Sequence, residues 1–247
     1  MKTLAFTVCH YGKEYLKYAI ESVKDSVDAH LISYTERPSF GYETSLRNPD
    51  TREELKAICD QYPHVIWEDI NGVMREHVHR ERAFSYARQN NFDIILVVDS
   101  DEVWNPDKVK EAIDHAYNSK NGQFLVNGSQ WITLWKSFNE YVNDGFAPVR
   151  LFNMHNDLKK AEHIDKGFIY HMGYCISDEL MRYKISCHGH KADFEKNNQW
   201  YNDKWIGYKK GSTKFLHPAT EAYWQEAKDF DKTKLPDLLK KHPKYKL

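Results

Sequence analysis

The sequence predicts an α/β protein in which a mainly parallel sheet is flanked by helices. In the first half of the chain, short apolar runs alternate with amphipathic segments, a pattern typical of strands and helices that build a parallel sheet. The most apolar run, residues 94–98, shows no alternation of polar and apolar residues, as in a strand buried on both faces. A chain of 247 residues is long enough for one such domain with additions.

The elements of the first half follow one another as strand and helix. We expect strands at residues 4–8, 29–34, 64–69 and 94–98, and helices at residues 14–27, 51–61, 74–90 and 107–117. Pro38 follows the second strand, and a proline cannot donate a hydrogen bond to a neighbouring strand. The strands therefore have defined ends at which side chains can gather.

From residue 123 the pattern changes to longer strands, expected at residues 124–135, 148–152 and 167–171, so this half is predicted to be α+β. Ser177 is the expected N-cap of a helix over residues 177–188. A helical, lysine-rich tail is expected over residues 191–247, which hold 13 Lys and no Arg against 8 Asp and Glu.

Composition excludes several classes of protein. A formal net charge of −1 gives no overall positive field for nucleic acid or an acidic membrane. The four cysteines lack the density and spacing of a disulfide framework and form no CxxC pair, which favours the reducing cytoplasm. No segment reaches membrane-spanning length, and the first apolar run is too short for a secretion signal.

An acidic cluster follows the most apolar strand directly: Asp99, Asp101 and Glu102. Ligands of open α/β sheets bind beyond the carboxyl ends of such strands. Two carboxylates two residues apart can converge on one hard cation and leave coordination positions for phosphate oxygens. The alternative is an acidic helix N-terminus before Pro106, favoured by the helix dipole.

Residues 93–106, DIILVVDSDEVWNP, resemble the DxD region of GT-A-fold glycosyltransferases, above all the family 2-like group and family 17. Residues 147–152, APVRLF, are similar to a family 2-like strand, and residues 170–174, YHMGY, to a late histidine motif. The resemblance implies a Rossmann-like GT-A catalytic domain over residues 1–190 and a separate basic, aromatic-rich extension over residues 191–247. It also implies transfer of a hexose or pentose from a nucleotide sugar, UDP-linked, to an acceptor hydroxyl group.

The resemblance further assigns a metal and a nucleotide site. It makes Asp101 a direct ligand of Mn²⁺ or Mg²⁺, Asp99 a ligand of ribose or a metal-bound water, and His171 the residue that completes the metal shell. The positions that correspond to nucleotide-binding residues are Thr7, Cys9, His10, Tyr11, Glu36 and Asp69. The turn at residues 35–38 departs from the Asp-rich turn of family 2, which leaves the base open.

The helix before the metal strand carries Arg80 and Arg82, which diverge by about 200° around a helix. Of the two, we expect Arg82 to reach the diphosphate. An inverting transferase needs a carboxylate to take the proton of the acceptor hydroxyl. The candidates are Asp144, Asp178 and Glu179.

Other interpretations stay open at this point. Residues 187–190, CHGH, could bind zinc, although no fourth ligand is evident. A nucleotidyltransferase would show a glycine-rich basic loop after the first strand, and residues 8–13 are a poor example. The tail, with its lysines and with Trp200, Trp205 and Tyr208, could bind nucleic acid. The acceptor is therefore left open, with a polysaccharide and modified DNA as candidates. We expect the tail to govern the binding of the acceptor and to contribute little to the binding of the donor.

Overall fold

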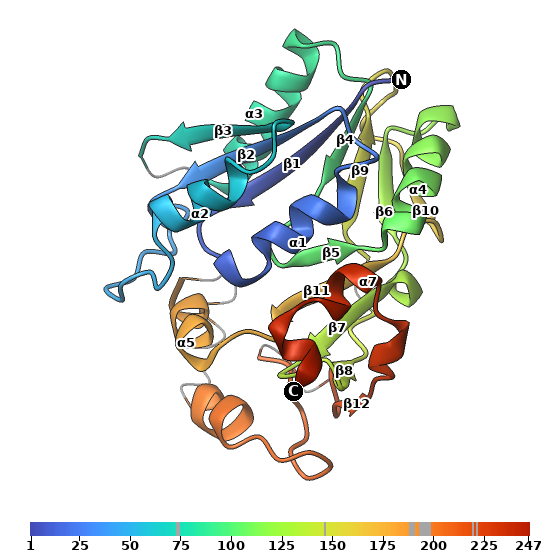
Figure 1. Cartoon of the computed structure of the whole chain (residues 1–247). Coiled ribbons are helices and arrows are strands. Elements are labelled where there is room, and N and C mark those ends of the chain that lie inside the picture. The colour runs from blue at the N-terminus through green and yellow to red at the C-terminus, as the bar shows by residue number, and fades with distance from the viewer. Residues whose placement is uncertain (73–74, 146, 188–190, 193–198, 219, 221) are drawn as a thin grey trace.

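The computed structural model of the chain describes residues 1–72, 75–145, 147–187, 191–192, 199–218, 220 and 222–247 (Figure 1). The strands are β1 Thr3–Cys9, β2 Ala29–Thr35, β3 Val65–Ile70, β4 Ile94–Val97, β5 Glu102–Trp104, β6 Gln123–Val126, β7 Trp131–Trp135, β8 Glu140–Val142, β9 Val149–Asn153, β10 Ala161–Ile164, β11 Ile169–Tyr174 and β12 Lys228–Asp229. The helices are α1 Lys13–Val23, α2 Arg52–Cys59, α3 Glu76–Gln89, α4 Pro106–Asn118, α5 Asp178–Cys187 and α7 Asp237–Lys240.

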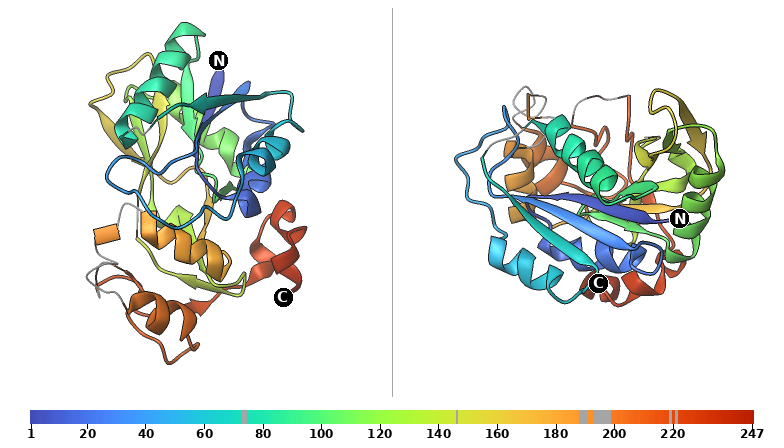
Figure 2. Two further views of the ribbon diagram at one scale, coloured as in Figure 1. Left: turned by 90° about the vertical axis from the view of Figure 1, so that its left-hand side faces the viewer. Right: turned by 90° about the horizontal axis from the view of Figure 1, so that it is seen from above.

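The larger sheet has seven strands in the order β10-β6-β9-β4-β1-β2-β3. Only β9 runs antiparallel to its neighbours, so the predicted mainly parallel sheet is confirmed. Apolar side chains of α1, α2 and α4 pack on one face of this sheet and those of α3 on the other (Figure 2). Strand β4 lies between β1 and β9 and is buried throughout, as its apolar sequence predicted.

A second, five-stranded sheet lies beside the larger one, with strand order β12-β8-β7-β11-β5 (Figure 1). The single strand predicted over residues 124–135 is wrong, because it divides into β6 in the larger sheet and β7 in the smaller one. The chain turns between them at Gly128, where a Cβ atom would lie 2.9 Å from the carbonyl carbon of Gly145. Close backbone approach of this kind needs glycine.

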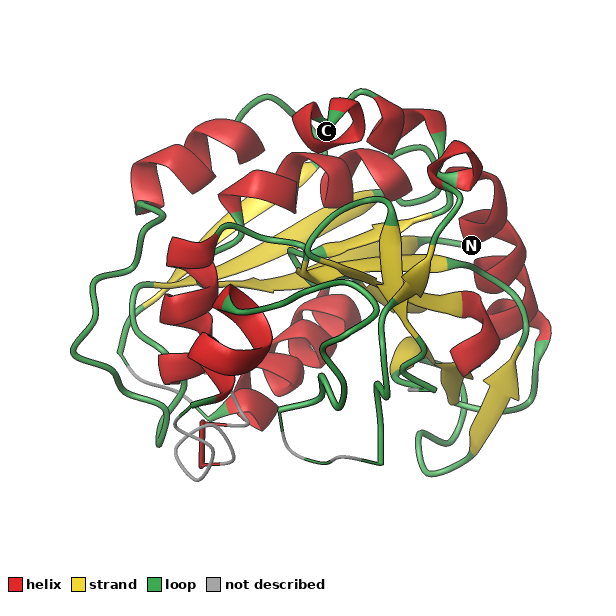
Figure 3. Ribbon diagram, turned by 90° about the horizontal axis from the view of Figure 1, so that it is seen from below, coloured by secondary structure: helices red, strands yellow, loops and turns green. Residues whose placement is uncertain are grey.

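The C-terminal segment, residues 199–247, completes the hydrophobic core around the second sheet. Trp200, Trp205 and Trp224 are buried in one cluster with Trp135 and Tyr174. The predicted helical tail is not confirmed as a run of full helices: its described part holds short helical turns and α7, joined by irregular chain (Figure 3). No helix in the described part of the chain is long and apolar enough to cross a bilayer.

Two predicted helix starts are placed by their capping residues. Asn105 accepts a hydrogen bond from the backbone N–H of Asp107 (3.0 Å) at the start of α4. Ser177 accepts one from the backbone N–H of Leu180 (3.2 Å), as its predicted role as N-cap of α5 requires. Helix α5 therefore begins directly after β11.

Candidate active site

The acidic turn, residues 99–102, lies where the two sheets meet. Ser100 donates a hydrogen bond from its hydroxyl to the carbonyl of Tyr11 (2.9 Å). Gly12, with a φ of +116°, is close enough that a Cβ atom would lie 2.5 Å from the Ser100 hydroxyl oxygen. The backbone N–H of Met172 in β11 donates to the carbonyl of Asp101 (2.7 Å). Contacts from the loop after β1 and from β11 thus hold the backbone of the acidic turn in place.

Asp99 and Glu102 both contact the buried guanidinium of Arg150 in β9. Its Nη2 lies 2.8 Å from Asp99 Oδ2, its Nε lies 3.0 Å from Glu102 Oε2, and Nη2 also pairs with Glu102 Oε1. Burial opposes the charge on Arg150, but attraction by Glu102 and Asp99 outweighs it and raises the pKa of Arg150. The protein itself therefore supplies a permanent cation to two of the three acids of the turn.

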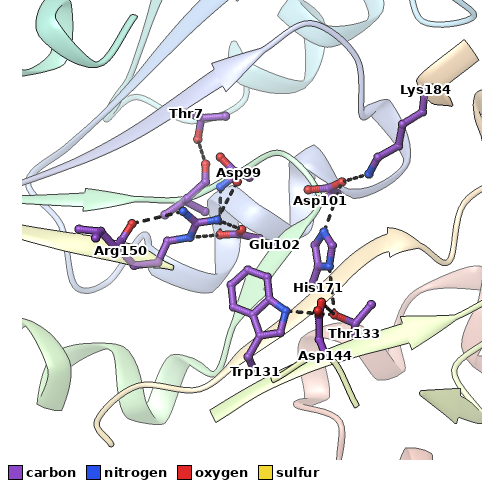
Figure 4. A network of polar contacts seen from close by, with 12 residues as sticks. Thr7, Asp99, Asp101, Glu102, Trp131, Thr133, Asp144, Arg150, His171 and Lys184 are labelled. Carbon is purple, nitrogen blue, oxygen red and sulfur yellow. Dashed lines mark hydrogen bonds and ion pairs between the residues drawn. The ribbon is translucent and has the colours of Figure 1, made fainter. Parts of the chain in front are cut away.

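Asp101 points away from Arg150, toward β11 and α5 (Figure 4). Its Oδ2 lies 3.9 Å from His171 Nε2 and accepts a hydrogen bond from Lys184 Nζ at 3.0 Å. A Cβ atom on Gly173 would lie 2.5 Å from His171 Nε2, 2.6 Å from Lys184 Nζ and 2.9 Å from Asp101 Oδ2. The three polar groups therefore face one point that is open only because residue 173 is glycine.

Thr133 in β7 determines which nitrogen of His171 carries the proton. Its hydroxyl donates to Asp144 Oδ2 (2.9 Å), because a carboxylate can only accept. The same hydroxyl, 3.3 Å from His171 Nδ1, can then only accept, so Nδ1 carries the proton. Burial lowers the pKa of His171, and the neutral ring turns the lone pair of Nε2 toward Asp101.

These residues fit a divalent cation held by two protein ligands, a carboxylate oxygen of Asp101 and Nε2 of His171. Within the described residues, no group of three or more His, Cys, Asp and Glu side chains is arranged as a complete metal site. The predicted third member, Asp99, faces Arg150 instead. A site with two protein ligands leaves positions for phosphate oxygens and water, as Mg²⁺ sites in nucleotide-binding proteins do.

The acidic turn opens into a cleft of about 580 Å³. Its charged side chains are those of Arg80, Asp99, Glu102, Asp144, Arg150 and Lys184, and Trp131, Tyr174 and Trp224 supply aromatic walls. A second hollow of about 800 Å³ shares Asp144, Ala147, His217 and Trp224 with this cleft. One continuous surface therefore runs from the acidic turn to the C-terminal segment.

Comparison with known proteins finds similarity in fold alone. No family model and no curated protein sequence matches the chain. TarS from S. aureus in complex with UDP has 10% identity and a TM-score of 0.46, over 81% of this chain and 78% of that one. GalNAc-T7 with UDP, GalNAc and Mn²⁺ has 9% identity and a TM-score of 0.48, over 82% of this chain and 51% of that one.

Glucosyl-3-phosphoglycerate synthase from Mycobacterium tuberculosis, in complex with Mn²⁺, UDP and phosphoglyceric acid, has 12% identity and a TM-score of 0.37. The match covers 53% of this chain and 43% of that one. Likenesses this distant say nothing of the activity of this chain, which depends on the side chains of its own site.

The structure places the first two predicted nucleotide residues inside the sheet. The hydroxyl of Thr7 donates to the carbonyl of Val98 (2.5 Å) and lies 2.8 Å from His30 Nε2, and its side chain is fully buried. Cys9 is also fully buried. Neither side chain has surface to offer a nucleotide, so both predictions are corrected: these residues support the strand end from within.

His10 and Tyr11 lie at the surface end of β1, where α5 covers them. His10 Nδ1 lies 2.7 Å from the carbonyl of Thr35, and its Nε2 lies 2.7 Å from the hydroxyl of Tyr183 in α5. The rings of Tyr11 and Tyr183 meet edge to face at 5.9 Å. The loop after β1 thus packs against α5. Its contact with a nucleotide stays a prediction.

Glu36 and Asp69, at the ends of β2 and β3, line one hollow of about 520 Å³ that is separate from the cleft at the acidic turn. Asp69 is not unpaired there: Arg52 Nε lies 2.7 Å from its Oδ1 and Arg52 Nη2 lies 2.5 Å from its Oδ2. The hydrogen bonds from Arg52 lower the pKa of Asp69. A nucleotide base at this position would meet a carboxylate that is already paired.

The two arginines of α3 diverge as predicted, and each lines a different hollow. Arg82 forms an ion pair with Glu68 and lines a different hollow together with it. Arg80 lines the cleft at the acidic turn. Arg82 therefore lies away from the cleft at the acidic turn, and its contact with a diphosphate stays a prediction.

Of the predicted catalytic acids, the structure places Asp144 in the cleft and Asp178 outside it. Asp178 Oδ1 accepts a hydrogen bond from the indole N–H of Trp205 (2.8 Å) and lies 3.4 Å from Lys136 Nζ. Asp178 thus binds the buried Trp205 of the C-terminal segment. It is not among the residues that line the cleft. The possible zinc ligands His188 and His190 lie outside the described residues.

Lys184 and Thr133 are the residues of this site that sequence reasoning missed. Lys184 comes from the middle of α5 and Thr133 from β7, and neither belongs to a motif. Only the folded chain brings them next to Asp101 and His171. The glycine two residues after His171 is the one local signal that could have indicated a crowded polar point.

Proposed function

We propose that this chain is a glycosyltransferase that moves a sugar from a nucleoside-diphosphate donor, UDP-linked, to an acceptor hydroxyl group. The observation that carries the proposal is the point that Asp101 and neutral His171 face together. His171 also lines the adjoining cleft, and Arg80, Arg150 and Lys184 are among the other residues that line it. A diphosphate with a divalent cation needs this combination of cation ligands and positive charge.

Asp101 and His171 would hold Mn²⁺ or Mg²⁺, and the bound ion would offset the negative charge that develops on the departing diphosphate. The chain's own cations Arg80 and Lys184 would contact the remaining phosphate oxygens. Asp99, whose side chain is 47% exposed, would accept a hydrogen bond from a ribose hydroxyl while Arg150 holds its direction.

Asp144 is the proposed general base, because it lines both hollows and its carboxylate is oriented by Thr133. In the transfer step the acceptor oxygen bonds to the anomeric carbon of the sugar. The bond from this carbon to the diphosphate oxygen breaks, and its electron pair stays on the diphosphate. The proton of the acceptor hydroxyl passes to Asp144.

The acceptor is proposed to enter through the second hollow. Tyr223 is 56% exposed there, and its ring meets that of His217 edge to face at 5.6 Å. An exposed aromatic ring next to polar side chains suits the apolar face of a sugar ring. A saccharide acceptor is therefore proposed.

Two observations argue against DNA as the acceptor and against nucleic-acid binding by the tail. Trp200 and Trp205, which would have to stack on bases, are buried in the core. Lys210 pairs with Asp229 and Lys214 with Glu226, which reduces the positive charge available to phosphates.

The loop after β1 likewise argues against a nucleotidyltransferase. The backbone N–H groups of Gly12 and Lys13, at the start of α1, donate to Asp50 Oδ2 at 2.7 and 2.9 Å. The helix N-terminus that would bind phosphate in such an enzyme is thus occupied by a carboxylate of the chain itself. The four free and buried cysteine thiols support the reducing cytoplasm as the proposed compartment.

The proposal is tested with a panel of nucleotide sugars and Mn²⁺, by release of nucleoside diphosphate in the absence of an acceptor. We expect slow hydrolysis of one donor, which also names the base and shows whether the sugar is a hexose or a pentose. EDTA should abolish the reaction. A folded protein that hydrolyses none of these donors, and whose melting temperature no nucleoside diphosphate raises, would overturn the proposal.

A further inference from the structure

Lys184 is a buried cation at the proposed metal position, and the proposed chemistry does not require it there. Its side chain is 7% exposed, and its Nζ donates to Asp101 Oδ2 (3.0 Å) and to the carbonyl of Gly173 (3.1 Å). The ammonium also lies 5.3 Å from the centre of the Tyr174 ring. Lys184 therefore neutralises Asp101 from the protein side.

The ammonium and a divalent cation compete for one place. A Cβ atom on Gly173 would lie within 3 Å of His171 Nε2, Lys184 Nζ and Asp101 Oδ2 alike, at 2.5, 2.6 and 2.9 Å. A cation bound by Asp101 and His171 would thus stand at contact distance from a like charge in a poorly solvated site, which is strongly unfavourable. Before Asp101 can bind a metal ion, Lys184 has to move.

Lys184 is able to move, whereas Arg150 is not. Arg150 is held by hydrogen bonds to two carboxylates, Asp99 and Glu102, through a planar fork. Lys184 has one carboxylate partner and a flexible aliphatic stem with a compact charge at its end. It also lines the cleft in which the diphosphate is proposed to bind.

We propose that Lys184 makes metal binding and nucleotide binding depend on each other. Without a nucleotide, its ammonium pairs with the carboxylate of Asp101 and keeps the affinity of the site for metal low. When a diphosphate enters the cleft, its oxygens take the ammonium, and Asp101 becomes available to the metal ion. By linkage, metal raises the affinity for nucleotide by the same factor. This inference rests on the proposed function.

The test measures Mn²⁺ affinity, by electron paramagnetic resonance of free Mn²⁺, with and without UDP as the probe. In the wild type, Mn²⁺ alone should bind weakly, and UDP should strengthen binding by about ten- to a hundredfold. Lys184→Met keeps the apolar stem and removes the charge. It should bind Mn²⁺ alone on the order of tenfold more tightly than the wild type, with a smaller effect of UDP.

The matched control is Lys136→Met, because Lys136 also pairs with an acid, Asp178, but outside the cleft. It should leave both affinities unchanged. Lys184→Gln retains a hydrogen-bond donor toward Gly173 without the charge, and serves if the methionine variant does not fold. It should behave as Lys184→Met.

The outcomes separate this inference from the proposed function. Wild-type affinity for Mn²⁺ alone in a folded Lys184 variant, with the effect of UDP unchanged, would overturn the role of Lys184 and leave the proposed function intact. Absence of any binding of Mn²⁺ and UDP to the wild type would overturn both.

Discussion

Asp99 and Asp101 have different partners although they are two residues apart in the sequence. Asp99 turns to Arg150, a cation that the fold holds permanently, and Asp101 turns to His171 and Lys184. Both side chains were predicted to serve one metal ion. That role stays a proposal for Asp101, whereas Asp99 has a partner 51 residues away in the chain, which no local pattern could indicate.

Asp101→Asn tests this difference, since it keeps the shape and removes the charge that holds a hard cation. We expect activity to fall by several orders of magnitude and Mn²⁺ affinity in the presence of UDP to fall with it. Asp99→Asn is the matched control and should retain most of the Mn²⁺ affinity. An equal loss of Mn²⁺ affinity in both variants, measured by the same titration, would show that Asp99 also contributes to metal binding.

Thr133→Val tests the hydroxyl that orients His171. The variant has nearly the same shape but cannot accept from Nδ1, so the tautomer that presents Nε2 to the metal is no longer favoured. We expect Mn²⁺ affinity to weaken by about 10- to 100-fold, the usual effect of losing such a support. Thr133→Ser should restore it. Unchanged affinity in the valine variant would show that the tautomer is set in another way.

At the scale of elements, the sequence predicted the first half of the fold well and the second half less well. Strands β1 to β4 and helices α1 to α4 were expected within a few residues of their observed bounds, because apolar runs and polar segments alternate clearly along this part of the sequence. The short strands β5, β8 and β10 have little such pattern, and each pairs with a strand from a distant part of the chain: β5 with β11, β8 with β12 and β10 with β6. The direction of side chains on α3 also depends on such neighbours.

Two arginines on α3 give a matched pair of variants. Arg80 lines the cleft, and Arg82 pairs with Glu68 away from it. We expect Arg80→Ala to weaken the binding of UDP by about tenfold, since one charge-assisted contact to phosphate is lost. Arg82→Ala should change it little. Calorimetric titration with UDP and Mn²⁺ measures both, and a larger loss in Arg82→Ala would support the prediction made from the sequence.

At the scale of the whole molecule, the C-terminal segment belongs to the core and contributes to the cleft. The division of the chain at residue 190 stays a prediction, but Trp200, Trp205 and Leu216 fill the cluster around Trp135, and Trp224 lines both hollows. Removing the tail would expose this cluster to water, so a truncated chain is not a neutral test of acceptor binding. Composition alone suggested a separate basic extension, because the sequence does not show that the tryptophans among its lysines are buried.

The last residues of the chain pack against α1 through a buried histidine. His242 stacks on Tyr15 of α1 with 4.9 Å between ring centres, and Lys244 donates to the carbonyl of Cys175. A second buried histidine, His30, lies in β2 against Thr7. Both imidazoles are buried, and neither lines the cleft of the proposed site.

These two histidines make stability depend on pH in a defined direction. Burial lowers the pKa of His30 to about 3 and that of His242 to about 4, against 6.5 for an unperturbed ring. Below pH 6.5 the unfolded chain therefore binds protons that the folded chain does not, so the free energy of unfolding falls as the pH falls. We expect a loss of roughly 2 to 4 kcal/mol between pH 7 and pH 5, a range in which carboxylates add little to it. Urea unfolding between pH 5 and pH 7 measures how steeply the free energy of unfolding depends on pH.

His242→Phe keeps a ring against Tyr15 but cannot take a proton, so the slope of its free energy of unfolding against pH should be shallower than that of the wild type. An equal slope in the variant would mean that His242 ionises as freely in the folded chain as in the unfolded one.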